Sequence, residues 1–253
     1  MPVDALADPA YCHAVVARLV DDPCRLASDE LPWSGLDVSR LRQIAGFIAK
    51  VRHNPIRFRL PLTMRALAAT GIEIDFFAHH APEFTARRRE GLTDQDRTAL
   101  FVAALEQWLS PSDDAHRVVA DVLAHELAML DTAAREPVAP PALDAVVDPD
   151  SRPRLRAGVR ILHITVHPPD VADLPPGGAA LSGIDRAARC HAYISTPAGP
   201  RVKSVAPALA PLIEMADGSA TVAEIATAVK IDAVADVAGV FEVFVRRGLA
   251  DID

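Results

Sequence analysis

The chain contains 253 residues, of which 50% are hydrophobic and 24% are charged, and its formal net charge is −8 at pH 7. This composition is typical of a folded globular protein and excludes a disordered or fibrous chain. The apolar runs are too short for a membrane-spanning helix, and Asp4 and Asp8 stand where a signal peptide carries basic residues, so we expect a cytoplasmic protein.

Residues 1–135 predict helices only. Apolar residues recur three and four positions apart, which is the spacing of a helix with one buried face. Turn and capping signals separate the helices: Asn54 precedes Pro55, Gly71 follows a helix that begins at Pro61, and Thr93 precedes another. The predicted helices cover about residues 9–20, 38–53, 61–70, 72–89, 94–109 and 113–130, so we expect an all-helical domain.

A proline-rich segment, residues 136–153, follows this helical half. It contains five prolines and no helical periodicity, so we place the domain boundary there. Beyond it, a second domain is predicted over residues 154–253. Alternating apolar and polar residues predict strands over Val159–Val166, Cys190–Thr196 and Arg201–Val205, with a long loop over Pro168–Ala188.

The last fifty residues predict three helices and a short exit strand. The helices cover about 207–216, 221–229 and 233–247, and the strand runs through Leu249 and Ile252. Thr221 and Glu224 fit a capping box, and Gly218 supplies the residue that ends the preceding helix. A three-stranded antiparallel sheet followed by three helices is a winged helix-turn-helix, so the predicted fold class is α+β.

Sequence signals for catalysis are missing. No nucleophile-elbow, phosphate-loop or dinucleotide-binding pattern occurs, and the three cysteines are too far apart for a metal-binding pair. The nine histidines suit surface or capped positions better than metal ligation. We therefore predict no catalytic residue, no metal ligand and no cofactor in this chain. A metalloenzyme that uses His79, Glu83 and His125 stays open as an alternative.

A winged helix binds either DNA or a peptide, and the charges favour a peptide. Residues 152–253 hold 11 Lys and Arg against 11 Asp and Glu, which is not the basic excess that phosphate neutralisation requires. The third helix carries Asp232, Asp236 and Glu242 but no Lys or Arg before Arg246. Anions on that helix would repel the phosphates of DNA. We therefore favour peptide binding and keep a DNA-binding transcriptional regulator as the alternative.

Peptide capture has a physical basis if the third strand lies at the edge of the sheet. Its unpaired N–H and C=O groups would then pair with an extended peptide beside the third helix. The predicted peptide-binding residues are Arg201, Val202, Lys203, Val205, Val240, Phe244 and Arg247. The basic residues, with Arg246, suit acidic residues of a peptide, while the alternative that they are merely solvated charges stays open.

The C-terminal half resembles a known peptide-binding module. Residues 157–252, and above all the stretch from Leu212 to Ala226 together with Arg247, Gly248 and Leu249, look like a PqqD-like recognition element. Such elements bind the leader peptides of ribosomally made, modified peptide natural products. The resemblance implies that this half captures a precursor peptide.

The helical half resembles the MbnC/TglI type of partner subunit of multinuclear non-haem iron-dependent oxidases, which act in methanobactin and thiaglutamate biosynthesis. The similarity lies in 47–54, 60–63 and 71–77. It implies a heterodimer in which a TIM-barrel subunit holds the iron and oxidises a precursor cysteine, while this non-catalytic subunit holds the peptide and docks the oxidase through its N-terminal helices. The predicted docking residues are His53, Asn54, Arg57, Phe58 and Arg59.

Overall fold

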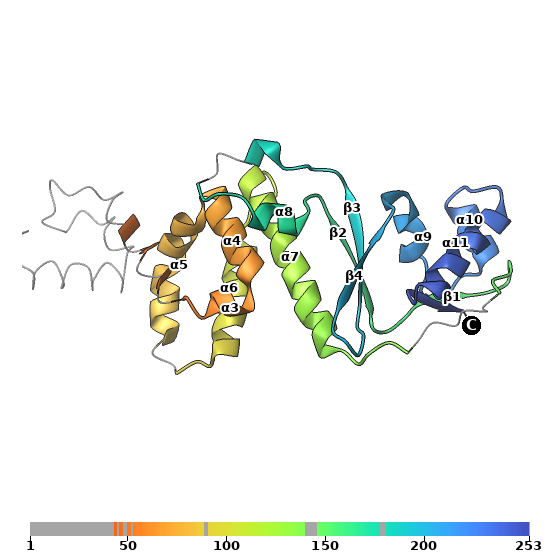
Figure 1. The fold of residues 1–253 in the computed structure, drawn as a ribbon, viewed down its shortest axis with the longest axis horizontal. Coiled ribbons are helices and arrows are strands. Elements are labelled where there is room, and N and C mark those ends of the chain that lie inside the picture. Colours follow the sequence, from red (N-terminus) through yellow and green to blue (C-terminus); the bar gives the residue numbers. More distant parts are fainter. Residues whose placement is uncertain are drawn as a thin grey trace, which may run out of the picture. The chain divides into compact units, whose positions relative to one another are not determined.

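The structure is a computed structural model, drawn in Figure 1, and it describes residues 43–44, 46–47, 50–51, 53–88, 91–139, 146–177 and 181–252. The helix predicted near residues 9–20 lies outside the described residues, as does the middle of the proline-rich segment. The described chain combines helices with two small antiparallel sheets, so the predicted α+β class is confirmed. None of the described helices is both long and apolar enough to cross a membrane.

The chain forms two compact units, and their limits differ from the predicted domains. The first unit includes the chain up to Leu123 together with Pro168–Ile184, and the second comprises Ala124–His167 and Asp185–Asp253. We expected a division in chain order at 136–153. The difference arises because residues after Leu123 pack on the sheet, whereas the segment after Pro168 packs on the helices.

The first unit is helical, as the sequence predicts. Its described helices are α3 (Ile56–Arg59), α4 (Pro61–Thr70), α5 (Glu73–Arg88), α6 (Asp94–Trp108), the start of α7 (Asp114–Ala134) and α8 (Pro168–Ala172). Gly71 ends α4 with a φ of 80°, and Thr93 caps α6 in a capping box with Asp96, as expected for these positions. Phe76, Phe77 and Phe101 are fully buried and fill the core.

The segment predicted as one long loop, Pro168–Ala188, contains two short helices. They are α8 and the 3-10 helix η3 (Leu181–Gly183). Helix α8 packs on α4, and the N–H of Gly177 donates to the carbonyl of Ala68 at 3.0 Å. Two prolines at its start suit the first turn of a helix, because those positions need no N–H donor.

The second unit contains both sheets. Strands β2 (Val159–Ile164), β3 (Arg189–Ile194) and β4 (Arg201–Val205) form an antiparallel sheet in the order β2-β3-β4, close to the predicted strands. A separate pair joins β1 (Pro153–Leu155) to β5 (Ala250–Ile252). Strand β1 was not predicted, because its three residues begin with the last proline of the proline-rich segment.

Three helices follow the sheet. They are α9 (Ala210–Glu214), which the 3-10 helix η4 (Pro207–Leu209) precedes, α10 (Val222–Ala228) and α11 (Val234–Arg246). The predicted capping box is confirmed: Thr221 Oγ1 accepts from the Glu224 N–H, and the Glu224 carboxylate accepts from the Thr221 N–H. Phe241 and Phe244 of α11 join Cys190, Ala192 and Ile194 of β3 in one hydrophobic core.

The opposite face of this sheet meets the second part of α7. His125 Nδ1 lies 2.7 Å from the Tyr193 hydroxyl of β3, and the Ser195 hydroxyl donates to the carbonyl of Arg135. Asp131 lies 3.4 Å from Arg160 of β2. The sheet of the second unit is therefore covered on both faces, by α9–α11 on one and by residues 124–135 on the other.

Candidate functional site

Strand β4 is one of the two edge strands of the three-stranded sheet, and β2 is the other. It pairs with β3 on one side only, with Tyr193 opposite Val202 and Ala192 opposite Lys203. Across the described residues, no backbone hydrogen bond links β4 to any segment except β3. Its second row of N–H and C=O groups is therefore open to a further strand, which is the condition that the sequence-based prediction required.

The side chains of β4 divide between the two faces of the sheet. Successive strand residues point to opposite faces, and Val205 lies in the core under α11. Arg201, Lys203 and Val205 therefore share the α11 face, whereas Val202 and Ser204 share the face that carries Tyr193, against which His125 of α7 packs. The side chains of the four predicted peptide-binding residues on β4 are thus not gathered on one surface, although their backbone lies along one edge.

Helix α11 runs beside this edge. Lys203 Nζ donates to the Arg247 carbonyl at 2.8 Å, at the end of the helix. Val240 is half-buried and Arg247 is exposed, but Phe244 and Val205 are buried in the core, so these two support the surface and offer no exposed side chain. Val243, 38% exposed, was missed by the sequence analysis, although it shares the helical spacing of Val240 and Arg247.

We call Arg201, Lys203, Val240, Val243 and Arg247 the β4–α11 surface. Its three cations lie close together: burial lowers the pKa of Lys203, and the charges of Arg247 and Arg201 lower that pKa further. No acidic side chain pairs with these three cations anywhere in the described chain. This surface therefore concentrates positive charge in a protein whose net charge is −8.

Arg246, the fourth basic residue of the sequence analysis, is placed differently. Its guanidinium lies 3.5 Å from the carboxylate of Glu242, one helical turn earlier on α11. Its charge is thus partly offset by a neighbour. Arg246 is therefore not a member of the unpaired cation group.

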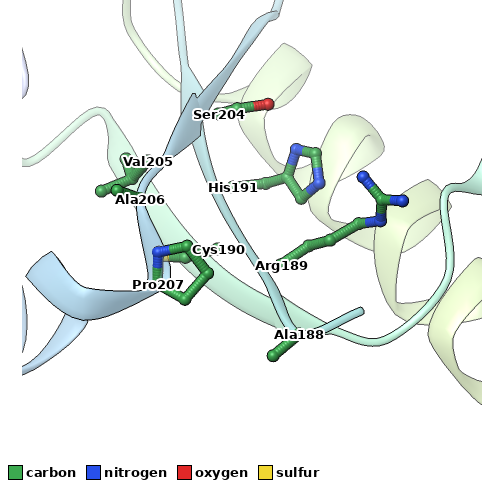
Figure 2. Close-up of a pocket in the computed structure, with 8 residues that line it drawn as sticks. All are labelled: Ala188, Arg189, Cys190, His191, Ser204, Val205, Ala206 and Pro207. Atoms are coloured by element: carbon green, nitrogen blue, oxygen red, sulfur yellow. The ribbon is translucent and has the colours of Figure 1, made fainter. Parts of the chain in front are cut away.

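A pocket of about 280 Å³ lies at the end of β4, where the chain turns into η4. It is lined by Ala188, Arg189, Cys190, His191, Ser204, Val205, Ala206 and Pro207. Figure 2 shows the side chains of Arg189, His191 and Ser204 on one side of the two strands, and those of Cys190, Val205 and Pro207 on the other. The sequence analysis did not find this pocket, because it forms from two strand ends that are sixteen residues apart.

The ionisable groups at this pocket are held neutral or paired. Burial, then the charges of His167 and Arg189, lowers the pKa of His191. Burial and the charge of Glu214 raise the pKa of the Cys190 thiol, so the thiol stays protonated and is a weak nucleophile. Arg189 pairs with Asp185 at 2.6 Å. The lining suits the binding of a side chain better than covalent chemistry.

The predicted docking residues lie around α3 in the first unit and have different surroundings. His53 packs against Phe77 and Phe84, with ring centroids 5.6 and 4.5 Å apart. Arg57 bonds the buried carboxylate of Glu73 at 2.5 Å. The remaining three are exposed: Asn54, Phe58 and Arg59.

Phe58 is the most exposed large apolar side chain of the described residues, with 89% of its surface accessible. An aromatic side chain of this kind normally buries a large area in a core or an interface. Here it stands between Arg57 and Arg59, so an apolar contact is flanked by two cations.

Histidine and acidic residues do not assemble a metal site in the described chain. Across those residues, no group of three or more His, Cys, Asp or Glu side chains gathers closely enough to hold a metal ion. Of the alternative metal set, His79 is exposed, Glu83 lies 3.6 Å from His80, and His125 bonds Tyr193.

No protein-family model matches the chain, and no curated protein matches it.

Proposed function

We propose that this chain is a non-catalytic subunit of a peptide-modifying complex in the biosynthesis of a ribosomally made natural product. Its second unit captures the leader segment of a precursor peptide. Its helical unit docks a TIM-barrel oxidase that carries the iron and modifies a cysteine of that precursor. The observation that carries the proposal is the open edge of β4 beside α11.

The element order of the second unit supports peptide capture. Three antiparallel strands followed by three helices, with a capping box on the second, match the order of a winged helix-turn-helix of the PqqD-like type. A guest strand on β4 would form main-chain hydrogen bonds worth about 0.5–1.5 kcal/mol each. One guest side chain in the pocket at the end of β4 would add about 1.5–3 kcal/mol if it is apolar and fully buried.

The charges of α11 support a peptide over DNA. Asp236 lies exposed in the first turn of α11, Asp232 lies exposed just before the helix, and Glu242 follows on its second half. A recognition helix in the major groove needs side chains that tolerate phosphate and donate to bases. We therefore keep DNA binding as the outcome that the binding experiment has to exclude.

The exposure of Phe58 supports a docking role for the helical unit. An accessible aromatic side chain between two arginines suits a partner surface that has an apolar pocket with acidic surroundings. The iron belongs to the partner in this proposal, so no ligand is assigned to this chain. What this chain supplies is binding: it brings the precursor to the oxidase and raises its local concentration.

Calorimetry with the full chain tests the proposal. The neighbouring genes are first searched for a small cysteine-containing precursor and a barrel oxidase, and the peptide found is titrated into the chain alone and into the chain co-expressed with that oxidase. We expect a complex with a Kd in the micromolar range, about −8 kcal/mol. Hydrogen exchange then locates the peptide, and we expect new protection at the amides of β4.

Two results would contradict this function. One is the absence of precursor binding both alone and with the oxidase. The other is binding that protects amides elsewhere and leaves β4 unchanged. Tight, salt-sensitive binding of the gene's own promoter duplex, in place of the peptide, would favour the regulator alternative.

A further inference from the structure

We infer that the β4–α11 surface selects an acidic guest strand, one that carries carboxylates two residues apart opposite Arg201 and Lys203. This inference rests on the proposed peptide capture and adds its sequence preference. It is carried by the open edge of β4, the shared face of its two cations, and the absence of acidic partners for them among the described residues.

The spacing of the cations defines the spacing of the guest carboxylates. Arg201 and Lys203 are two residues apart on β4, so their side chains leave the same face about 6.6 Å apart along the strand. A paired guest strand presents its own alternate residues at that same interval, directly opposite. Two acidic residues with one residue between them therefore meet both cations, whereas two adjacent acidic residues point to opposite faces.

The surroundings of the cations strengthen the preference. Lys203 Nζ is held near the end of α11 by the Arg247 carbonyl, so the three cations converge without a counter-charge. Asp236 shares their side of α11 by helical spacing, but it lies eleven residues before Arg247, about 16 Å along the axis. A carboxylate at the surface would thus be attracted by three cations and repelled by no close anion of this helix.

The same charges disfavour a second copy of the chain as the occupant. In an antiparallel pairing of two β4 edges centred on Lys203, this lysine would face its own copy, and Arg201 would face Val205. Like charges directly opposite each other destabilise a strand pair, and a lysine on an edge strand is a known protection against self-pairing. In this register the edge therefore favours a guest of opposite charge over its own copy.

Short capped peptides test the preference by fluorescence anisotropy with the full chain. The first peptide has a background of alternating Thr and Val with Glu at two positions, i and i+2. The second has Gln at both positions, and the third has Glu at i and i+1. We expect the first to bind about tenfold more tightly than the second, which is about 1.4 kcal/mol, and several-fold more tightly than the third, which has the same charge.

Protein variants assign the effect to the named cations. In the double variant Arg201→Gln/Lys203→Gln, we expect the three peptides to bind alike. Arg246→Gln is the matched control, because this arginine already pairs with Glu242, and we expect it to keep the order of affinities. Raising the salt concentration should weaken the first peptide most, since its advantage is electrostatic.

The outcomes separate this inference from the proposed function. If the three peptides bind equally to the wild-type chain, or if none binds, the acidic preference is overturned. Peptide capture itself is tested separately, by the calorimetric titration with the precursor. If duplex DNA binds through Arg201 and Lys203 and the acidic peptide does not, the occupant is a nucleic acid and the inference is overturned. Self-association that Lys203→Gln abolishes would also overturn it.

Discussion

At the scale of single residues, the buried carboxylate of Glu73 stabilises the helical unit through two ion pairs. Only 4% of Glu73 is exposed, and its two oxygens lie 2.5 Å from Lys50 Nζ and from the Arg57 guanidinium. A buried carboxylate needs such partners because its desolvation is costly. Glu73, in the first turn of α5, thus ties this helix both to Lys50, which precedes α3, and to Arg57 of α3.

We predict that Glu73→Gln lowers the free energy of unfolding by about 1–3 kcal/mol. This loss is smaller than the roughly 3–5 kcal/mol typical of a fully buried ion pair, because both cations are partly exposed and regain water when the carboxylate is lost. Calorimetric melting of the variant measures the change. Asp75→Asn is the control: it removes an exposed carboxylate from the same helix, and its melting temperature should stay within about a degree of the wild type. Equal losses in the two variants would contradict the role of Glu73.

His125 makes the second unit sensitive to acid. Burial lowers the pKa of His125 to about 4, and the charges of His191 and His167 add to this effect. The unfolded chain, whose histidine has its ordinary pKa of 6.5, takes up a proton between about pH 6.5 and 4, and the folded chain does not. Stability therefore falls as the pH is lowered through this interval.

We predict that the melting temperature falls less between pH 7 and pH 5 in His125→Gln than in the wild type. Glutamine cannot be protonated, so the variant lacks this contribution, and a smaller dependence from His191 and other groups remains. Differential scanning calorimetry at the two pH values measures the difference. Parallel losses in the wild type and the variant would show that His125 is not the group responsible.

At the scale of elements, the short helix α10 depends on its first turn. It has seven residues, and isolated helices of that length are not stable in water. We predict that Thr221→Ala, which removes the cap, costs about 0.5–2 kcal/mol of unfolding free energy. Thr227→Ala is the matched control, because the Thr227 hydroxyl caps no helix end and only donates to the Ala223 carbonyl within the helix. A loss in Thr227→Ala as large as in Thr221→Ala would contradict the capping argument.

The elements that the sequence predicted well are those with a local cause. The capping box at Thr221 and Glu224, the stop at Gly71 and the strand at Arg201–Val205 all follow from a few neighbouring residues. Strand β1 was missed because a three-residue strand that begins with Pro153 carries no alternation to recognise. Its pairing with β5 is a contact between residues nearly a hundred positions apart.

The candidate site was predicted only in part for the same reason. The edge position of β4 follows from the order of hairpins along the chain, and the sequence analysis had made it a condition of peptide capture. The burial of Phe244 and Val205 depends on how α11 lies on the sheet, which periodicity alone does not specify. The pocket at Cys190 and Pro207 depends on how β3 and β4 are aligned against each other, and no local sequence pattern predicts that register.

At the scale of the whole molecule, the proposal assigns peptide capture and oxidase docking to different units. A substitution in one unit should therefore leave the other activity intact. We predict that Phe58→Asp strongly reduces co-purification of the oxidase and leaves the affinity for the precursor peptide within about twofold of the wild type. Pull-down with tagged chain, followed by calorimetry, measures both.

Val146→Asp is the control for this experiment. Val146 belongs to the second unit and is 81% exposed, so the substitution places the same charge on another accessible apolar side chain. We expect it to leave oxidase recovery unchanged. Equal loss in both variants would mean that the added charge, and not the position of Phe58, disturbs the complex.

Helix α7 is shared by both units, and this has a consequence for the gene. Its first half, through Leu123, belongs to the helical unit, and its second half lies on the sheet, where His125 meets the fully buried Tyr193. A break in the coding sequence at the proline-rich segment would separate Tyr193 from the residue that satisfies its hydroxyl. Recombination that joins either half to an unrelated sequence at that place would leave the Tyr193 hydroxyl without His125 and one face of the sheet uncovered. We therefore expect selection to keep the two halves together in one gene.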